Sequence, residues 1–393
     1  MKTIPQSPRK IAVVIRGYGK TGGAELFASE VTERLARNNS FEIHVFANEL
    51  APNSERLKFH KVPIIQFPRF LHQLSFAWFV SLMIKRMKFD LVHSHEWIFN
   101  ADIFTVHSLP HASWIRNVRK KRYFSFFDRG KIAVEQRAIK TGGSSRFLPV
   151  SSIAMEAYRR EYRDLPGQWK VLNPGVNVAR FSTPDRAECR AEIRGRYGIG
   201  ESDVLLIFVG MSFGIKGLDT IIEALSKARC ILPEANIRLL VVGRGGNEES
   251  KFRRVAHSLG VAESVIFAGA QVDELERYYR AADIFIMLSK FDTFGMVVLE
   301  AMASSLPVIV SSNVGAKDIV EDGVNGFVLP AYQDAEAAAE RIIRLSDAAR
   351  RESMGRAASQ TASMHDWGKL AEKMERYYLG TLTMKNALKL NLA

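Results

Sequence analysis

The segment from Phe291 to Ala303, FDTFGMVVLEAMA, places two acids eight residues apart. If a helix begins at Gly295, Asp292 stands just before it and Glu300 lies on it, a little over two turns after Asp292. The backbone N–H groups of residues 294–297 would then face an anion, while the two carboxylates accept hydrogen bonds from hydroxyls. This pattern can hold a diphosphate and hydroxyl groups together. An ordinary helix with Asp292 as its N-terminal acid is the alternative.

A glycine-rich loop follows the first apolar run of the chain. Gly17, Gly19 and Gly22 form the pattern GxGxxG, which is typical of dinucleotide-binding proteins. That function also needs an acid about 20 residues further on, and the nearest candidate, Glu49, lies 27 residues after Gly22. The same loop also resembles part of a phosphate-loop motif, but the first glycine of that motif is absent. The loop is therefore expected only to bring the N–H groups of Gly22 and Gly23 close to an anion at a helix start.

His93, His95 and Glu96 resemble part of a metal site. Alternation along a strand would place the two histidines on one face, but no third ligand at a recognisable spacing is present. A structural or cleft-lining role is favoured, and we expect no metal and no bound cofactor. The two cysteines, Cys189 and Cys230, have neither metal-ligand spacing nor the number needed for a disulfide framework, which fits a reducing, cytoplasmic setting.

Short apolar strands alternating with helices are expected to position these residues. Helices are predicted over 25–37 and 70–88, and strands over 11–15, 41–47, 63–67, 90–95, 103–108 and 146–152. After a turn-rich stretch at 172–184, further strands are predicted over 204–210, 237–243, 265–269, 284–288 and 307–312. This alternation predicts an α/β fold with two doubly wound, Rossmann-like domains facing a cleft. We expect an N-terminal domain over 1–171, a C-terminal domain over 172–365, and a final helix over about 366–380 that packs back towards the first.

The charge of the chain is concentrated in its first half. Over 393 residues with globular composition, 55 Lys and Arg oppose 42 Asp and Glu, for a net charge of +13. Residues 1–170 carry a net +14, and the remainder carries −1. Such an excess suggests nucleic acid, an anionic membrane or an anionic substrate as partner, with a solvated basic face as the alternative.

Part of the excess flanks apolar and aromatic residues, as expected for an anionic membrane surface. The apolar stretch 70–84 is too short and too interrupted to span a bilayer, and the N-terminus has no signal-peptide pattern. We therefore expect a cytoplasmic protein, peripheral on the inner membrane. The expected membrane or acceptor surface comprises Lys85, Arg86, Lys88, Arg116, Arg119, Lys120, Lys121 and Arg122.

Several segments of the second half resemble the retaining nucleotide-sugar glycosyltransferases of the GT-B fold, family four. In order, they are VGMSFGIKGLDTIIEAL, LLVVGRGG, AADIFIMLS, FGMVVLEAMASSLPVIVS and GVNGFVL. The resemblance extends over essentially the whole chain and is looser before Leu148. Within the family, the chain is most similar to the lipopolysaccharide core glucosyltransferases, on VGMSFGIKGLD, AVEQRAI and LNPGV.

The resemblance implies roles for individual residues. Glu300 would hold the nucleotide ribose, Asp292 the donor sugar, and Lys216 the diphosphate leaving group, while His107 would line the cleft near the reacting carbon. Asp292 replaces the Glu usual in the family and is one methylene shorter. The implied donor-binding set is Gly22, Gly23, Lys216, Gly243, Arg244, Asp292, Phe294, Gly295, Met296, Val297 and Glu300, and the implied catalytic set is His107, Lys216 and Asp292.

The chain departs from the family pattern near Lys216. Ile215 and Met211 occupy positions where the family often has an arginine. The expected reaction is transfer of a hexose from a nucleotide diphosphate sugar, UDP-linked by preference, to a glycolipid such as lipopolysaccharide core. The preferred hypothesis is metal-independent front-face attack, with a phosphate oxygen taking the acceptor proton. A weak or inactive sugar-nucleotide- or glycan-binding module is the first alternative. A basic nucleic-acid-binding protein is the second, although no nucleic-acid-binding motif is present and no nucleic-acid partner is expected.

Overall fold

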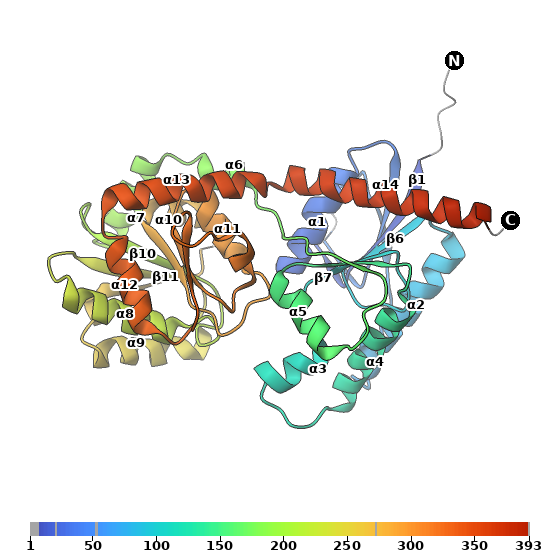
Figure 1. Ribbon diagram of the computed structural model, residues 1–393, viewed down its shortest axis with the longest axis horizontal. Helices are drawn as coiled ribbons and strands as arrows, with labels where there is room; N and C mark the ends of the chain where they lie inside the picture. Colours follow the sequence, from blue (N-terminus) through green and yellow to red (C-terminus); the bar gives the residue numbers. More distant parts are fainter. Residues whose placement is uncertain (1–7, 20–21, 52–53, 272, 392–393) are drawn as a thin grey trace, which may run out of the picture. The chain divides into compact units, whose positions relative to one another are not determined.

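The computed structural model describes residues 8–19, 22–51, 54–271 and 273–391, and it divides the chain into two compact units (Figure 1). Unit 1 comprises Met1–Pro174 together with Trp367–Ala393. Unit 2 comprises Gly175–Asp366. The division falls inside the turn-rich stretch 172–184. Each unit is a parallel sheet covered by helices, which agrees with the predicted α/β class of two Rossmann-like domains.

Unit 1 contains a seven-stranded parallel sheet in the order β5-β3-β1-β6-β7-β8-β9. Its strands are β1 (Arg9–Val14), β3 (Phe41–Ala47), β5 (Lys58–Lys61), β6 (Leu91–Ser94), β7 (Ile103–Val106), β8 (Arg146–Pro149) and β9 (Gln168–Trp169). The central strands are apolar because helices bury both faces of the sheet. The strand order reverses between β1 and β6, so their carboxyl ends open a crevice of the kind in which such sheets bind ligands.

The helices of unit 1 include one from the far end of the sequence. They are α1 (Gly23–Leu35), α2 (Leu71–Met87), α3 (His111–Ser113), a π-helical turn (Trp114–Val118), α4 (Phe126–Thr141), α5 (Ser152–Glu161) and α14 (Trp367–Asn391). The two short strands β2 (Gly17–Tyr18) and β4 (Glu49–Leu50) pair separately. Trp367 of α14 meets Phe27 of α1 edge to face at 5.7 Å, and Asn38 donates a 2.7 Å hydrogen bond to Glu375.

The strand predicted over 63–67 is wrong, because the third strand of this sheet lies earlier, at β5. β5 pairs with β3 from His44 to Ala47, and the Val62 N–H closes the ladder on the Ala47 carbonyl. Pro63 follows directly and has no N–H to continue the pairing. The apolar side chains of Ile65 and Phe67 are exposed rather than buried in the sheet.

Unit 2 contains a six-stranded parallel sheet in the order β12-β11-β10-β13-β14-β15. Its strands are β10 (Val204–Val209), β11 (Ile237–Val242), β12 (Val265–Gly269), β13 (Ile284–Met287), β14 (Val308–Ser311) and β15 (Gly326–Leu329). The order again reverses at the centre, between β10 and β13. The loops that follow these two strands are therefore the expected ligand position of this unit.

Helices cover both faces of the second sheet (Figure 1). They are α6 (Val178–Ser182), α7 (Arg186–Arg196), α8 (Leu218–Ile231), α9 (Glu249–Ser258), α10 (Leu275–Ala281), α11 (Met296–Ala303), α12 (Ala335–Arg344) and α13 (Ala348–Met364), with 3-10 turns at Gly246–Glu248, Ala262–Ser264 and Gly315–Ile319. Within the described ranges, none of the helices is long and apolar enough to cross a membrane.

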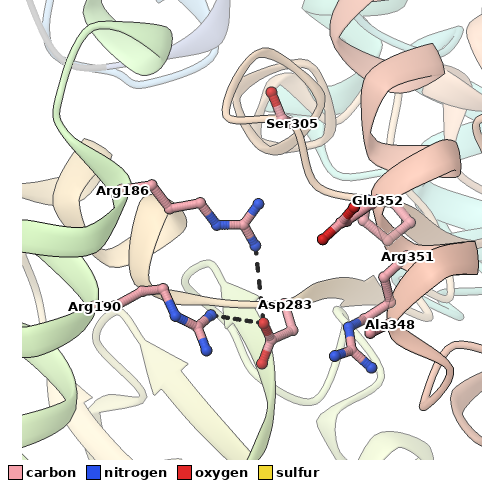
Figure 2. A pocket seen from close by; sticks show the side chains of 8 residues that line it. Arg186, Arg190, Asp283, Ser305, Ala348, Arg351 and Glu352 are labelled. Atoms are coloured by element: carbon pink, nitrogen blue, oxygen red, sulfur yellow. Dashed lines mark hydrogen bonds and ion pairs between the residues drawn. The ribbon is translucent and has the colours of Figure 1, made fainter. Parts of the chain in front are cut away.

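A pocket of about 280 Å³ lies at the opposite edge of this sheet, where β13 and β14 begin (Figure 2). Asp283 accepts hydrogen bonds from Arg190 at 2.8 Å and from the buried Arg194 at 2.7 Å. Arg351, on the other side of the pocket, donates to the carbonyls at the end of α12. These arginines already hydrogen-bond to groups of the protein. We therefore interpret the network as structural, holding α7 and α13 against the sheet.

Candidate active site

The loops after β10 and β13 bring together the two charged residues that the sequence placed 76 positions apart. The Nζ atom of Lys216 forms an ion pair and hydrogen bond with Oδ2 of Asp292. The two loops are joined by the backbone, since Lys290 donates its N–H to the Ile215 carbonyl at 2.8 Å. The hydroxyl of Ser289 donates to the same carbonyl at 3.1 Å. Lys216 and Asp292 thus lie at the crevice of unit 2, on two loops that are held together by hydrogen bonds.

Asp292 is held on three sides. Its N–H donates to the Asn313 carbonyl at 3.0 Å, its own carbonyl accepts from the Gly315 N–H at 3.0 Å, and its Oδ1 accepts from the Phe294 N–H at 3.2 Å. Both carboxylate oxygens therefore have partners, Oδ1 locally and Oδ2 from Lys216. A hydroxyl ligand would have to share or replace these contacts.

The start of α11 differs in one respect from the expectation. The N–H of Phe294 is occupied by Asp292 and its side chain is 4% exposed, so Phe294 contributes packing rather than a free donor. The available donors at the helix start are therefore those of Gly295, Met296 and Val297. Gly295 is required here, because it has φ +87° and a Cβ atom would come within 2.9 Å of Met287.

Glu300 lies on α11 and is partnered by a residue that the sequence did not reveal. The hydroxyl of Tyr279, on α10, donates to Oε2 of Glu300 at 3.0 Å. Burial raises the pKa of Glu300, while the hydrogen bond from Tyr279 and the charge of Arg180 act in the opposite direction. Burial holds the pKa of the Tyr279 hydroxyl well above its usual range, so it stays a donor. Glu300 can accept hydrogen bonds from hydroxyls in its ionised form.

Two glycines let the loops of unit 2 pack closely. Gly243 has φ +138°, and a Cβ atom there would lie 1.8 Å from the Gly210 carbonyl oxygen. A Cβ on Gly217, which precedes α8 with φ +76°, would meet the Leu288 carbonyl oxygen at 1.9 Å. Arg244 follows Gly243 and is exposed. Met211 and Ile215 are exposed at 69% and 40%, so neither supplies a charge beside Lys216.

Three histidines gather at the crevice of unit 1. His95 Nδ1 and His107 Nε2 are 3.0 Å apart, and His93 is hydrogen-bonded to Thr105 Oγ1 and to the Tyr378 hydroxyl, each at 2.8 Å. Burial lowers the pKa of His93 and of His107 to about 3, so both are neutral near pH 7. In the part of the chain that the structure describes, no group of three or more His, Cys, Asp or Glu residues could hold a metal ion.

His95 and His107 line a cavity of about 260 Å³, together with Glu96, Trp97 and Ser108. Nε2 of His95 is buried and has no hydrogen-bond partner in the described part of the chain. Gly22 and Gly23 lie nearby in the fold, at the exposed start of α1, where Gly22 is extended and Gly23 begins the helix. Lys20 and Thr21 of the same loop lie outside the described residues.

A second cluster at this crevice was not predicted. Arg16 follows β1, and its Nη2 donates to His72 Nδ1 on α2 at 2.6 Å. Lys131 on α4 and Glu96 after β6 lie close enough to influence each other's pKa. These residues come from four separate segments and share no local motif, so no sequence pattern could have identified them together.

The basic residues expected on the membrane or acceptor surface are all exposed. Lys85 and Arg86 end α2 and Lys88 follows it, whereas Arg119 to Arg122 follow the π-helical turn. Arg116 differs, because it forms an ion pair with Glu161. Its charge is neutralised locally and adds little to the surface.

Two family models match the chain. Residues 21–180 match the family described as Glycosyltransferase Family 4, and residues 190–361 match the family described as Glycosyl transferases group 1. Together the two matches take in most of unit 1 and most of unit 2. The residues assembled after β10 and β13 lie within the second match.

Individual proteins agree with this assignment. A D-inositol 3-phosphate glycosyltransferase of Streptomyces bingchenggensis is 25% identical over 415 residues, covering 94% of this chain and 89% of that one. WaaG, a glycosyltransferase involved in lipopolysaccharide biosynthesis, superposes with a TM-score of 0.75 at 23% identity, covering 93% of this chain and 98% of that one. Anabaena HepE in complex with UDP-glucose superposes with a TM-score of 0.68 at 18% identity, covering 95% and 100%. The chain belongs to the glycosyltransferases of the GT-B fold, with a family-four domain followed by a group 1 domain.

Proposed function

We propose that this glycosyltransferase moves a hexose, with retention of configuration, from a UDP-linked sugar to a glycolipid of the lipopolysaccharide core type. The observation that carries the donor half is the Lys216–Asp292 ion pair beside the start of α11, with Glu300 on the same helix. A cation, three backbone N–H groups and two carboxylates are the complement of a diphosphate attached to two sugars. A structural neighbour crystallised with UDP-glucose supports the choice of nucleotide.

In the proposed reaction, the bond between the anomeric carbon and the diphosphate oxygen breaks, and negative charge accumulates on UDP. Lys216 and the N–H groups of Gly295 to Val297 stabilise that charge. Lys216 then exchanges its contact with Asp292 for the diphosphate, which frees Asp292 to accept hydrogen bonds from the donor sugar. Glu300 accepts hydrogen bonds from the ribose, with Tyr279 fixing its carboxylate.

The acceptor hydroxyl attacks the same face from which UDP departs, and a phosphate oxygen of the leaving diphosphate takes its proton. His107, in unit 1, is neutral near pH 7 because burial lowers its pKa to about 3, so it can offer hydrogen bonds without charge. We propose that no metal takes part, since Lys216 and the helix start supply the positive charge that the leaving group needs.

For the acceptor, we propose an anionic glycolipid reached from the membrane surface. One segment of unit 1 combines exposed apolar side chains with positive charge. The apolar side chains are Phe67 and Trp78, and the cations are Lys85, Arg86 and Lys88. Such a surface is suited to the interface of an anionic bilayer. A neighbour involved in lipopolysaccharide biosynthesis supports this acceptor class, whereas a relative that acts on D-inositol 3-phosphate keeps a small phosphorylated acceptor as the competing choice.

The test is a transfer assay with UDP-, GDP- and ADP-linked glucose against rough lipopolysaccharide and against D-inositol 3-phosphate. We expect transfer from UDP-glucose to lipopolysaccharide, an α-linked product by NMR, and full activity in the presence of EDTA. A β-linked product would contradict retention, and activity that EDTA abolishes and a divalent ion restores would contradict the role of Lys216. Transfer to inositol phosphate alone would replace the acceptor.

A further inference from the structure

We propose that the cavity lined by His95 and His107 binds an uncharged sugar ring, and that Nε2 of His95 forms a hydrogen bond with one of the hydroxyl groups of that ring. This inference rests on the proposed function and specifies one contact to its sugar substrate. The cavity lies in unit 1, at the carboxyl ends of β6 and β7, which is the usual ligand edge of a doubly wound sheet.

The two ring nitrogens of His95 differ in their surroundings. Nδ1 lies 3.0 Å from Nε2 of His107, within hydrogen-bond distance. Nε2 is buried and has no hydrogen-bond partner among the described residues, and His95 as a whole is 7% exposed. A buried polar atom without a partner costs free energy. Since Nδ1 is taken by His107, Nε2 is the atom of His95 that remains for a ligand in the cavity.

His93, on the neighbouring strand β6, shows the usual arrangement of a buried histidine. Its Nδ1 is hydrogen-bonded to the Tyr378 hydroxyl and its Nε2 to Thr105 Oγ1, each at 2.8 Å. Both of its nitrogens therefore have partners within the protein. The contrast identifies His93 as structural and leaves His95 as the histidine with an open hydrogen-bonding position.

The contact between His95 and His107 limits what kind of group can bind. Burial lowers the pKa of His107 to about 3 and holds that of His95 well below its usual range, so both rings are neutral near pH 7. A neutral imidazole has one N–H and one bare nitrogen. If His95 donates to His107, Nε2 of His95 is an acceptor, whereas if it accepts from His107, Nε2 carries the proton. A hydroxyl both donates and accepts, so it fits either arrangement.

Neighbouring rings hold the two imidazoles in place. Phe27 of α1, which is fully buried, lies 5.7 Å from His95 and meets His107 edge to face at 5.1 Å, measured between ring centroids. The ring of His93 lies 4.3 Å from that of His95. These contacts restrict rotation of both imidazoles. The position of Nε2 is therefore fixed before a ligand binds, which lowers the cost of ordering the site.

The remaining walls of the cavity suit an uncharged ligand. Its volume of about 260 Å³ is several times the roughly 30 Å³ that one water molecule occupies in the liquid. Among the described residues that line it there is no Lys or Arg, so a phosphate or carboxylate would meet no counter-ion there. Apolar side chains alternate with the hydroxyls of Thr105 and Ser108, and Trp97 adds an aromatic wall. Walls of this kind are typical of small-molecule sites, and they match the C–H faces and hydroxyls of a sugar ring.

The experiment uses the full-length enzyme with His95→Asn as the main variant. Asparagine keeps a polar atom near the position of Nδ1, which contacts His107, and has none at the position of Nε2. His95→Phe, which keeps a ring against Phe27, takes its place if circular dichroism shows that the first variant does not fold. The matched control is His93→Asn, because both nitrogens of that histidine are occupied by the protein.

Two arms distinguish the sources of the ring, since the donor hexose and the acceptor sugar carry the same chemistry. The donor arm measures acceptor-independent UDP release from UDP-glucose and from each of its monodeoxy analogues. If the ring is the donor's, we expect the wild type to discriminate against one analogue by roughly 5-fold to 100-fold in kcat/KM, the value of one buried hydrogen bond. His95→Asn should lose this discrimination, and His93→Asn should keep it.

The acceptor arm measures transfer from saturating UDP-glucose to rough lipopolysaccharide. If the ring is the acceptor's, His95→Asn should lower kcat/KM for lipopolysaccharide by the same factor and leave acceptor-independent UDP release at the wild-type rate. His93→Asn should leave both unchanged.

The inference is wrong if the folded His95 variant keeps both the donor discrimination and the kcat/KM for lipopolysaccharide of the wild type. Equal effects of His93→Asn and His95→Asn in both arms would also overturn it, because both residues would then act only through the folding of unit 1. A wild-type enzyme that neither binds nor hydrolyses any UDP-sugar would instead contradict the proposed function itself.

Discussion

The two units have the same central strand order, yet their ligand edges carry opposite kinds of chemistry. Unit 2 presents a formal ion pair, Lys216 with Asp292, and a carboxylate on α11. Unit 1 presents imidazoles that burial keeps neutral, and seven of the nine histidines of the chain lie in it. The fold supplies the crevice in both cases, and the residues that follow the strands decide which partner it suits.

Under the proposed function, this difference gives the two edges separate tasks. Stabilising a departing diphosphate requires fixed positive charge, which neutral imidazoles near pH 7 do not provide. Shaping a sugar pocket requires hydrogen-bonding groups with little charge, and the buried, neutral imidazoles of His95 and His107, which line the cavity of unit 1, are groups of this kind. The comparison therefore predicts that variants of unit 2 affect chemistry most and that those of unit 1 affect stability and acceptor choice.

The largest expected effect is on turnover. Lys216→Ala should lower kcat by about 10²- to 10³-fold, the loss seen when one preorganised donor to a developing anion is removed. Lys251→Ala, an exposed lysine of α9 in the same unit, is the control and should keep the wild-type rate. Transfer rates under saturating donor measure both. A wild-type kcat in Lys216→Ala would contradict the idea that the edge of unit 2, unlike that of unit 1, stabilises the leaving diphosphate.

The second effect is on the pH dependence of stability. His93 and His107 have a pKa of about 3 in the folded chain, against an ordinary 6.5, so the unfolded chain binds more protons between these values. The free energy of unfolding of unit 1 should therefore fall as pH drops below 6.5, by about 2 kcal/mol for each histidine on going from pH 7 to pH 5. Hydrogen exchange of β6 and β7, compared with β10 and β11, measures this. Equal losses in both units would contradict the contrast, and His93→Gln should reduce the loss in unit 1.

A smaller effect concerns the surface of unit 1. Replacing Lys85 and Arg86 by glutamine should weaken binding to anionic vesicles by about 1 kcal/mol per residue, roughly 30-fold in all. The matched control replaces Lys251 and Arg254, two exposed cations of unit 2, and should bind as the wild type does. Co-sedimentation at low salt measures the binding. Equal losses from both pairs would mean that net charge alone, without a defined surface, directs the protein to membranes.

The smallest effect sharpens the role of Glu300. Burial already raises its pKa, and the Tyr279 hydroxyl counteracts this. Tyr279→Phe should raise the pKa further, so UDP binding, which under the proposed function needs the ionised carboxylate, should be lost at a higher pH on acidification than in the wild type. Tyr278→Phe is the control on the same helix, since Tyr278 contacts Arg196 and Tyr197 instead. Titrations of UDP affinity against pH measure the shift. If UDP affinity falls at the same pH in Tyr279→Phe as in the wild type, Glu300 is not the group whose protonation weakens UDP binding.

The sequence predicted unit 2 better than unit 1 for a physical reason. Asp292, Gly295 and Glu300 belong to one strand, turn and helix, so their spacing alone determines their geometry. The cluster of Arg16, His72 and Lys131 depends on which elements the sheet brings together, and no local pattern encodes that. Two details at the crevice of unit 2 were also not predicted: Asp292 accepts a hydrogen bond from the N–H of Phe294, and Glu300 accepts one from Tyr279 on another helix.

The strand prediction failed where the apolar composition indicated a strand but the backbone could not continue the hydrogen-bonded ladder. The segment 63–67 has the composition of a strand, but Pro63 cannot donate to the ladder, and the less apolar β5 takes its place. The central strands were predicted correctly because helices bury both of their faces, which forces continuous apolar runs.

The most direct test of the account is hydrogen exchange of the full-length enzyme with and without saturating UDP-glucose. We predict protection of residues 210–217 and 291–300 in the wild type, and its loss in Glu300→Gln at the same ligand concentration. Protection confined to unit 1, or to the arginine pocket around Asp283, would contradict the assignment of the donor site to the loops after β10 and β13.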